Sequence, residues 1–344
     1  MTEPQQPRIA VLLPCYNEEA AIGATVAGFR AALPGATVYV YDNNSRDRTR
    51  EVAAKAGAVV RTERQQGKGH VVRRMFADVD TDIYVMADGD LTYDPKSAPA
   101  MVDLLIAEQL DMVVGTRRHE EKLAYRGGHL LGNRIFTGLL AGLFGRSFTD
   151  IFSGYRVFSR RFVKSFPVLS AGFEIETEMS VHALELSMPV GEVETAYAAR
   201  PEGSQSKLST WSDGWRILRT IMTLYRVERP KLYFGLIGAL LAALAIVLAI
   251  PLVVTYLHTG LVPRFPTAIL VTGIIIVAVL SFFAGLILDT VTRGRLEVRR
   301  LAYLSLSAPA FAGEGARSKS GGGAPPSRLR RATSPRKRGE ERVP

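Results

Sequence analysis

Two carboxylates separated by one glycine, Asp88-Gly89-Asp90, stand directly after a short apolar run, Ile83-Tyr84-Val85-Met86. Such a run is typical of a buried strand, so both carboxylates would lie at a strand end with a flexible glycine between them. Hard oxygen ligands of this kind suit Mg²⁺ or Mn²⁺, which bridge the phosphates of a nucleoside diphosphate. An isolated Asp-X-Asp is also common in turns. Its position after an apolar strand favours the cation site.

A second group is the lysine of Gln66-Gly67-Lys68-Gly69, on a glycine-flanked bend at the start of an expected helix. Lys68 would either reach a phosphate or cap that helix, and the sequence leaves both interpretations open. Neither a P-loop nor the glycine-rich turn of dinucleotide-binding domains is present. The single cysteine, Cys15, has no base near it in the sequence and is interpreted as a loop thiol. The five histidines show no metal-ligand spacing with it, which disfavours zinc.

Short β-rich runs alternate with helical patterns in the first third of the chain. The expected strands are residues 9–13, 37–41, 59–61, 83–86 and 112–114, and the expected helices are residues 18–33, 47–56, 68–79 and 97–109. This alternation predicts an α/β domain with a parallel sheet and helices on both faces. Because ligands of such sheets sit outside the carboxyl ends of the strands, the expected site loops are residues 14–19, 42–49 and 88–94.

Two long segments, residues 232–257 and 265–288, contain no charged residue. Each exceeds the roughly 20 residues that cross a bilayer as a helix. Buried core helices, the alternative, are normally shorter and carry a polar stripe. Five Lys and Arg residues precede the first segment and four follow the second, against a lone Arg264 between them. We therefore expect a multi-pass protein of the cytoplasmic (inner) membrane with the soluble domain and both termini in the cytoplasm.

Composition divides the chain into four parts. We expect a soluble catalytic domain at residues 1–207, an interfacial amphipathic helix at 208–231, two transmembrane helices within 232–290, and a basic, largely disordered tail at 291–344. Residues 208–231 would alternatively form a helix docked on the soluble domain. The apolar residues 130–144 fit either a re-entrant or interfacial helix beside the acceptor or a core helix. Four glycines would let the transmembrane helices approach closely: Gly235, Gly238, Gly273 and Gly285.

The net charge of +10 is mostly local, because residues 308–344 alone hold nine Lys and Arg against three Glu. A basic surface spread over the domain, as nucleic-acid binding requires, is therefore not indicated. One cysteine allows no intrachain disulfide, which fits a reducing compartment.

Together these motifs resemble those of family 2 glycosyltransferases of the dolichyl-phosphate or polyprenyl-phosphate sugar synthase type, over roughly residues 8–230. The matching pieces, in order, are Pro14-Cys15-Tyr16-Asn17-Glu18-Glu19, Asp42-Asn43-Asn44-Ser45-Arg46-Asp47-Arg48-Thr49, Gln66-Gly67-Lys68-Gly69, Asp88-Gly89-Asp90-Leu91-Thr92, Gly115-Thr116-Arg117, residues 150–156, and Arg200-Pro201-Glu202-Gly203-Ser204-Gln205-Ser206-Lys207-Leu208. One departure is visible, because the family often has Asp-Asp-Gly-Ser where this chain has Asp42-Asn43-Asn44-Ser45. The identity of the base therefore stays open.

The resemblance implies a nucleotide-diphospho-sugar transferase fold (GT-A, Rossmann-like) followed by a two-helix transmembrane hairpin. It implies that the donor nucleotide contacts Pro14, Tyr16, Glu18, Asp42 and Asn43. The diphosphate and its Mg²⁺ or Mn²⁺ would contact Lys68, Asp88, Gly89 and Asp90, and Thr92 would be a further residue on the metal side. Arg117, Arg200, Ser206 and Lys207 would surround the phosphates of donor and acceptor, with Asp90, Arg117 and Lys207 catalytic. Glu174 and Glu176 fit either an acidic residue near the sugar, as the resemblance implies, or an ordinary helix N-terminus rich in Glu, and Glu174 is taken as the possible sugar contact.

The implied reaction is the inverting transfer of a sugar from a UDP- or GDP-sugar to a polyprenyl (dolichyl or undecaprenyl) phosphate in the lipid bilayer. One alternative is another lipid acceptor, such as diacylglycerol or ceramide. A processive polysaccharide synthase would add a Gln-x-x-Arg-Trp motif and more spans, and neither is present. The non-catalytic alternatives are a membrane scaffold that binds nucleotide-sugar or a subunit of a lipid flippase. The sequence leaves a homo-oligomer open.

Overall fold

The computed structural model describes residues 6–118, 148–172, 174–198, 226–227 and 229–306. It divides the chain into two compact units. Residues 1–209 and 299–344 belong to the first unit, and residues 210–298 form the second.

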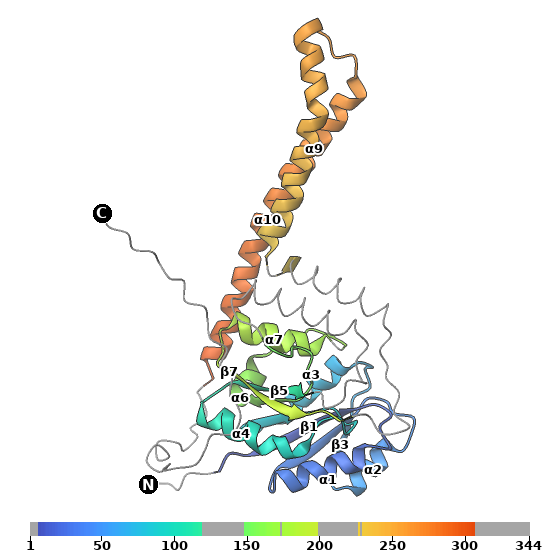
Figure 1. Ribbon diagram of the computed structural model, residues 1–344, viewed down its shortest axis with the longest axis vertical. Helices are drawn as coiled ribbons and strands as arrows, with labels where there is room; N and C mark the ends of the chain where they lie inside the picture. The colour runs from blue at the N-terminus through green and yellow to red at the C-terminus, as the bar shows by residue number, and fades with distance from the viewer. Residues whose placement is uncertain (1–5, 119–147, 173, 199–225, 228, 307–344) are drawn as a thin grey trace, which may run out of the picture. The chain divides into compact units, whose positions relative to one another are not determined.

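The first unit contains a seven-stranded sheet with the strand order β3-β2-β1-β4-β6-β5-β7 (Figure 1). The strands are β1 (Ile9–Cys15), β2 (Thr37–Asp42), β3 (Val59–Thr62), β4 (Ile83–Met86), β5 (Met112–Arg118), β6 (Arg156–Ser159) and β7 (Val190–Ala196). β2 and β4 both pair with β1 in parallel, on its opposite edges. The direction in which strands are added therefore reverses at β1, and such switch points are where ligands bind in open α/β sheets.

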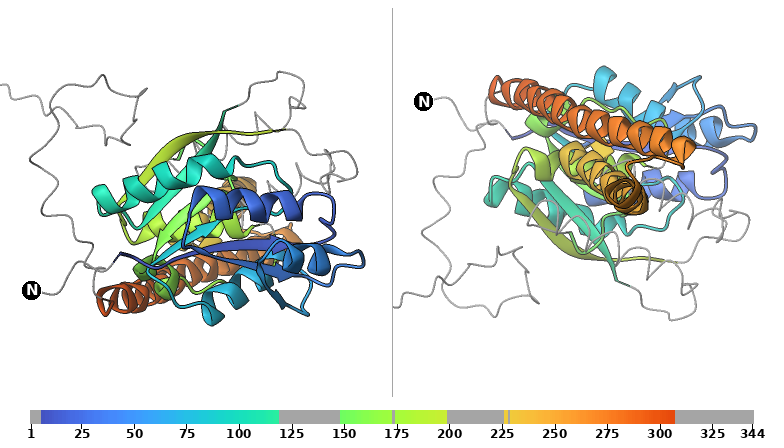
Figure 2. Two further views of the ribbon diagram at one scale, coloured as in Figure 1. Left: turned by 90° about the horizontal axis from the view of Figure 1, so that it is seen from below. Right: turned by 90° about the horizontal axis from the view of Figure 1, so that it is seen from above.

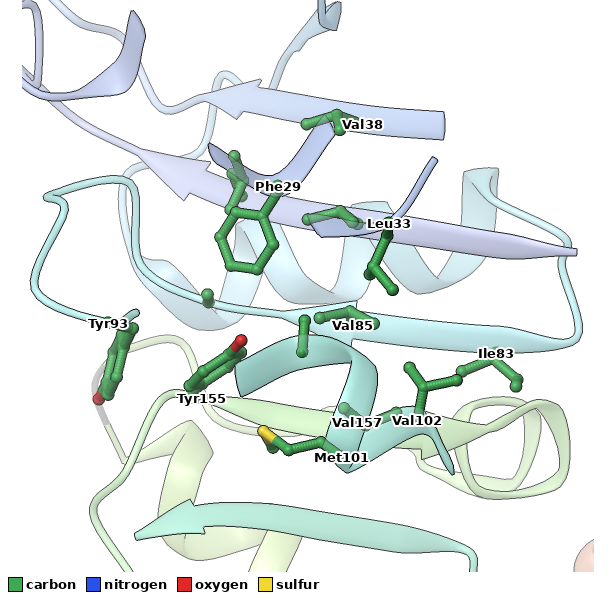
Figure 3. Close-up of a cluster of buried hydrophobic side chains, with 14 of the residues drawn as sticks. Phe29, Leu33, Val38, Ile83, Val85, Tyr93, Met101, Val102, Tyr155 and Val157 are labelled. Atoms are coloured by element: carbon green, nitrogen blue, oxygen red, sulfur yellow. The ribbon is translucent and has the colours of Figure 1, made fainter. Parts of the chain in front are cut away.

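Helices cover both faces of this sheet (Figures 1 and 2). They are α1 (Ile22–Ala32), α2 (Thr49–Lys55), α3 (Lys68–Asp78), the 3₁₀ turn η1 (Pro95–Ser97), α4 (Ala98–Ala107), α6 (Arg160–Ser165) and α7 (Ile175–Glu185). On one face, α1 and α4 pack on alternate residues of the strands, and Phe29, Val85 and Met101 are fully buried there (Figure 3). Burial of these apolar side chains is the main force that holds the layers together.

The opposite face is closed by an aromatic cluster from α3, β6 and α6. Phe158 stacks on Phe162 with ring centroids 4.7 Å apart, and Phe76 meets Phe158 edge to face at 5.8 Å. All four residues of β4 are buried, because helices cover the sheet on both faces. This explains why Ile83–Met86 is apolar throughout and does not alternate with polar residues.

The sequence predicted the first five strands and the four helices between them, but neither the antiparallel strand β6 nor the edge strand β7. β6 pairs antiparallel with both β4 and β5, so the sheet is mixed rather than parallel. The sequence gives little sign of β6, because it has only four residues and begins with a charged one, Arg156. That arginine is fully buried, and its guanidinium donates to the carbonyls of Ser153 (2.9 Å) and Ile151 (2.6 Å).

A buried histidine in α7 gives this unit a predictable acid sensitivity. His182 is 1% exposed and lies against the rings of Phe162 and Phe166. Its Nε2 contacts Ser165 Oγ at 3.3 Å. Burial, assisted by the charge of Arg299, lowers the pKa of His182 from 6.5 to about 3. The folded state therefore holds this imidazole neutral.

We expect acid to destabilise the unit through His182. The unfolded chain binds a proton below pH 6.5 that the folded chain does not take up until about pH 3, so stability is present above 6.5 and lost as the pH falls. The loss at pH 5 should be about 2 kcal/mol. Urea unfolding of the full chain in micelles at pH 7 and pH 5 measures it. The same pH dependence in His182→Leu would contradict this assignment.

The second unit contains two long apolar helices, α9 (Pro230–Thr259) and α10 (Phe265–Leu304), the latter as far as Val298. Both are long and apolar enough to cross a membrane by length and composition, and 17% of the most apolar window of each is buried. A core helix of a soluble protein would instead be mostly covered. Large apolar side chains such as Leu240, Ile246 and Ile276 are exposed.

Two of the four expected glycines allow α9 and α10 to pack closely. A Cβ atom on Gly238 would lie 2.9 Å from the carbonyl oxygen of Ala278, and one on Gly285 would lie 3.1 Å from Phe234 Cβ. Gly235 and Gly273 have nothing within 4 Å. The two close contacts agree with the role of small residues between membrane helices.

The second helix is longer than expected. α10 continues through residues 291–304, which the sequence assigned to a disordered tail. Its last residues, from Arg299, belong to the first unit, where Arg299 pairs with Glu185 and Tyr303 Oη donates to Asp111 Oδ2 at 2.7 Å. These polar contacts order the segment. The expected tail beyond residue 306 and most of the interfacial helix expected at 208–231 lie outside the described residues. The end of that range is corrected, because α9 already begins at Pro230.

Candidate active site

The expected loops meet at the carboxyl ends of β1, β2 and β4. Loops 14–19 and 42–49 are joined by backbone amides that donate to side chains: Asn17 N to Ser45 Oγ (2.9 Å), Glu18 N to Thr49 Oγ1 (2.9 Å) and Glu19 N to Asp47 Oδ2 (3.1 Å). Asn17 has a positive φ of 54°, which asparagine tolerates better than most residues. Pro14, Tyr16 and Glu18 are half-buried on this first loop. The two loops therefore form one connected wall.

Asp42 and Asn43, at the end of β2, order the chain around this wall. Asp42 is fully buried, and its carboxylate accepts from the backbone amide of Ser45 at 3.2 Å. Asn43 Nδ2 donates to the carbonyls of Glu63 (3.0 Å) and Gln65 (2.7 Å), while its Oδ1 accepts from Gly67 N (2.7 Å). In this structure Asn43 thus holds residues 63–67 beside the site. That link adds a positioning role to the nucleotide contact expected from the sequence.

The two carboxylates predicted to hold a cation follow β4. Asp90 is 2% exposed, and its Oδ1 accepts from the Thr92 amide (3.2 Å) and from Thr92 Oγ1 (2.6 Å). Thr92 therefore acts on Asp90, whose orientation it fixes. Leu91 between them has φ 60°, an uncommon conformation for a residue with a bulky side chain. Strain of this kind is often found at functional turns.

Gly89 allows the turn to lie against Cys15 on β1. A Cβ atom on Gly89 would be 2.4 Å from Cys15 Sγ. Cys15 is buried, and its pKa is raised well above 9.0 by burial first and then by the surrounding carboxylates. The thiol is therefore protonated, which fits the expectation that it is not a nucleophile. The expected loop position is corrected, because Cys15 is the buried last residue of β1.

Lys68 lies between two carboxylates instead of at the helix end alone. Its Nζ is 2.5 Å from Asp88 Oδ1 and 2.5 Å from Glu176 Oε1. Burial would lower the pKa of Lys68, but the charges of Asp88 and Glu176 outweigh it and raise the pKa. Lys68 is therefore a permanent cation in the site. Its neighbour Glu176, at the start of α7, is buried, whereas Glu174, the expected sugar contact, is half-buried at the helix N-cap.

The donor set fits a divalent cation that arrives with a diphosphate. Among the described residues no group of three or more His, Cys, Asp or Glu side chains could hold a metal ion on its own. Asp88 and Asp90 supply carboxylates, and Asp88 keeps 31% of its side chain exposed. Magnesium typically binds one or two carboxylates together with substrate phosphates and water. The site suits that mode better than an all-protein metal cage.

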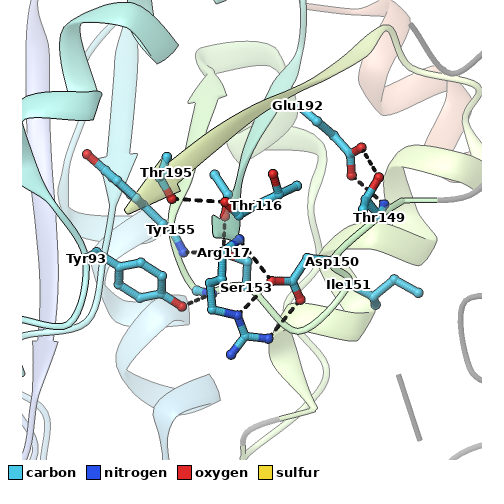
Figure 4. A network of polar contacts seen from close by, with 12 residues as sticks. Tyr93, Thr116, Arg117, Thr149, Asp150, Ile151, Ser153, Tyr155, Glu192 and Thr195 are labelled. Atoms are coloured by element: carbon cyan, nitrogen blue, oxygen red, sulfur yellow. Dashed lines mark hydrogen bonds and ion pairs between the residues drawn. The ribbon is translucent and has the colours of Figure 1, made fainter. Parts of the chain in front are cut away.

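Arg117, at the end of β5, is fixed by an aspartate that sequence reasoning did not single out. Its Nε and Nη2 donate to the two carboxylate oxygens of Asp150 at 2.7 and 2.8 Å (Figure 4). Its guanidinium also lies 5.5 Å from the ring centroid of Tyr197. This fork geometry holds the plane of the guanidinium in one orientation.

The chain around Asp150 is ordered by Ser153 and Tyr93. Ser153 Oγ donates to the carbonyl of Gly115 at 2.5 Å, and Tyr93 Oη accepts from Gly154 N at 2.8 Å (Figure 4). The buried guanidinium of Arg156 also stabilises residues 150–154, because it donates to the carbonyls of Ile151 and Ser153. Burial lowers the pKa of Arg156 to about 10, so it remains charged near neutrality. β5, β6 and the loop before β6 therefore form a rigid support for Arg117.

The structure brings most of the predicted residues together at one edge of the sheet. Arg200, Ser206, Lys207 and the apolar residues 130–144 lie outside the described residues. Sequence reasoning left Glu176 ambiguous and gave Asp150 no role. Glu176 gave no local signal, because it stands in the Glu-rich start of α7, and its burial beside Lys68 is visible only in the fold.

Comparisons with known proteins identify the family of this chain. The model of the family described as "Glycosyl transferase family 2" matches residues 10–166. Glycosyltransferase AglJ of Haloferax volcanii is 35% identical over 255 residues, which are 74% of this chain and 83% of that protein. The dolichyl-phosphate hexose transferase of the same organism is 28% identical over 67% of this chain and 100% of its own length. The chain belongs to glycosyl transferase family 2.

The fold has solved counterparts. The crystal structure of glucosyl-3-phosphoglycerate synthase from Mycobacterium tuberculosis with Mn²⁺, UDP and glucosyl-3-phosphoglycerate superimposes with a TM-score of 0.53. It is 25% identical, and the match covers 64% of this chain and 79% of that one. The same enzyme was also solved with Mg²⁺ and UDP, at 23% identity and a TM-score of 0.51. The chain is thus a GT-A nucleotide-sugar glycosyltransferase.

Proposed function

We propose that this glycosyltransferase transfers a sugar from a UDP- or GDP-sugar to the phosphate of a polyprenyl lipid, with inversion at the anomeric carbon. The proposal is carried by one combination: a two-carboxylate, lysine and arginine site in a chain that also has two exposed apolar helices of membrane-spanning length. The name of the Haloferax dolichyl-phosphate hexose transferase supports the acceptor class.

On the donor side, Asp88 and Asp90 would hold Mg²⁺ or Mn²⁺. That ion would neutralise the charge that grows on the departing nucleoside diphosphate. Lys68, already protonated, and Arg117, already oriented by Asp150, add fixed positive charge at the same edge. Charges fixed before the reaction stabilise a transition state without a reorganisation cost. Departure of the leaving group is the step these residues serve.

On the acceptor side, little base catalysis is required. A phosphomonoester has a second pKa of about 6, so a lipid phosphate is largely a dianion near neutrality and is already nucleophilic. Its direct attack on the donor sugar inverts the anomeric centre. The membrane helices would hold the domain at the bilayer surface and so raise the effective concentration of the lipid head group.

The proposed topology keeps the outer ends of the two helices, the catalytic domain and both termini in the cytoplasm. Its support is the distribution of Lys and Arg, which are concentrated outside the hairpin, with Arg264 alone in the short connection. Nucleotide-sugars would then reach the site from the cytoplasm.

The direct test uses the purified full chain with radiolabelled UDP- and GDP-sugars, Mg²⁺ or Mn²⁺, and undecaprenyl phosphate. Label extracted into the organic phase is the expected result. Diacylglycerol and ceramide in parallel reactions test the alternative acceptors. Label on either of these, and none on undecaprenyl phosphate, would reject the proposed acceptor. Donor binding without label on any lipid would favour the non-catalytic scaffold.

We expect Arg117→Lys to reduce transfer by about 10²-fold, because lysine keeps the charge but cannot form the two-pronged link to Asp150. Initial rates at saturating donor measure this loss. The matched control is Arg160→Lys, since Arg160 pairs with Asp80 through the same two nitrogens (3.0 and 3.4 Å) on an exposed surface away from the site. Equal transfer rates for Arg117→Lys and the wild type would show that the orientation of the Arg117 guanidinium does not contribute to transfer.

A further inference from the structure

The ammonium of Lys68 is shared by two carboxylates that differ in how freely they can move. Asp88 lies in the turn after β4 and is 31% exposed, whereas Glu176 lies in α7 and is 6% exposed. Asp88 is also the residue that the proposed cation requires. Of the two partners, only Glu176 can stay with Lys68 throughout the reaction.

The surroundings give the ammonium little room to leave. The side chain of Lys68 is 9% exposed. A Cβ atom on Gly154 would lie 3.2 Å from Lys68 Nζ and 3.0 Å from Asp88 Oδ2, so the backbone of Gly154 closes that side. A buried ammonium with no carboxylate partner is strongly destabilising. Lys68 therefore cannot release Asp88 cheaply unless another anion holds it.

We propose that Glu176 is a positioning residue that retains Lys68 in the diphosphate site when Asp88 turns from Lys68 to the divalent cation. Glu176 acts through Lys68 and touches neither the cation nor the sugar. Before donor binding, the ammonium of Lys68 bridges both acidic side chains. After donor binding, Lys68 stays on Glu176 and faces the diphosphate, while both carboxylates of the Asp88-Gly89-Asp90 turn serve the cation. The inference rests on the proposed use of a divalent cation and a nucleotide-sugar at this site.

Removal of Glu176 should therefore weaken binding of the loaded nucleotide. In Glu176→Gln, Asp88 is the remaining carboxylate of the pair around Lys68, so the cation must break that ion pair without compensation. In Lys68→Met there is no ammonium to hold, and an unpartnered Glu176 repels the diphosphate. Glu176→Gln should then do no further harm in the Lys68→Met background. Glu176→Gln should therefore weaken binding of the metal-loaded nucleotide only when Lys68 is present.

The experiment measures Mn²⁺ binding to the full chain by electron paramagnetic resonance of free Mn²⁺, at saturating UDP or GDP, whichever the wild type binds. We expect Glu176→Gln to weaken Mn²⁺ binding at least tenfold, and Glu176→Gln with Lys68→Met to bind no more weakly than Lys68→Met alone. An effect below twofold in the wild-type background would overturn the proposal. The same loss in both backgrounds would also overturn it, because Glu176 would then act on the cation directly.

Glu185→Gln is the matched control. Glu185 lies on the same helix, has 7% of its side chain exposed and pairs with Arg299, so it reports the general cost of neutralising a buried carboxylate in α7. It should leave Mn²⁺ binding within twofold of the wild type. If Glu176→Gln does not fold, Glu176→Asp replaces it, with the same two comparisons and the same contradicting results.

The lipid-labelling assay separates this inference from the proposed function. If the Mn²⁺ results are as expected but no lipid is labelled, the acceptor proposal fails and the role of Glu176 stands. If lipid is labelled but Glu176→Gln binds Mn²⁺ like the wild type, the transfer proposal stands and the role of Glu176 fails.

Discussion

Asp90→Asn should abolish sugar transfer, by about 10³-fold or more, while the protein still folds and inserts into membranes. Asp90 is buried, and its Oδ1 accepts from the amide and the hydroxyl of Thr92. Asparagine has the same shape and can keep both bonds through its own Oδ1, so the substitution removes the charge and little else. Label transferred into the lipid phase measures the effect, and carbonate extraction of the membranes measures insertion.

Asp94→Asn is the matched control for this change. Asp94 lies on the same loop and its Oδ1 caps the η1 turn by accepting from Lys96 N at 3.0 Å, a bond that asparagine also makes. Its transfer rate should equal that of the wild type. Normal turnover by Asp90→Asn would show that no essential cation depends on this carboxylate. A loss in both variants would point to the loop structure rather than to charge.

The position of the Asp88 and Asp90 site was predictable because it depends on local sequence. Ile83–Met86 is a continuous apolar run, and a strand buried on both faces requires that pattern. The side chains that follow such a strand must lie at its carboxyl end. The same reasoning predicted the loops after β1 and β2, whose neighbouring positions follow from the parallel pairing of these strands.

The carboxylate partners of the basic side chains Lys68 and Arg117 were not predictable in the same way. Lys68 meets Glu176 and Arg117 meets Asp150 only because distant segments fold together, and no spacing rule in the sequence pairs them. Both carboxylates stand in segments whose local patterns have ordinary explanations, a helix start and a short connection before a strand. Arg156 is a related case, since a buried cation held by carbonyls leaves no periodic signal. Tertiary contacts decided these roles.

Gly69→Ala should destabilise the catalytic unit by about 3 kcal/mol, although alanine normally stabilises a helix relative to glycine by about 0.5–1 kcal/mol. Gly69 is the second residue of α3, and a Cβ atom there would lie 2.0 Å from the carbonyl oxygen of Ser170 and 2.9 Å from the carbonyl carbon of Ala171. These are backbone atoms, so no side chain can rotate to relieve the clash. The Tm of the full chain should fall by roughly 6–12 °C.

Gly23→Ala is the matched control, because Gly23 is likewise the second residue of its helix, α1. The nearest atom to a Cβ there is Val52 Cγ1 at 3.1 Å, a methyl group that can shift slightly. Its Tm should stay close to that of the wild type. An equal Tm for Gly69→Ala would mean that the loop at Ser170 does not press on α3. The Gly69 amide also donates to the carbonyl of Ala171 at 3.1 Å, so this close packing fixes the loop at Ser170 and Ala171 against the start of α3, where Lys68 lies.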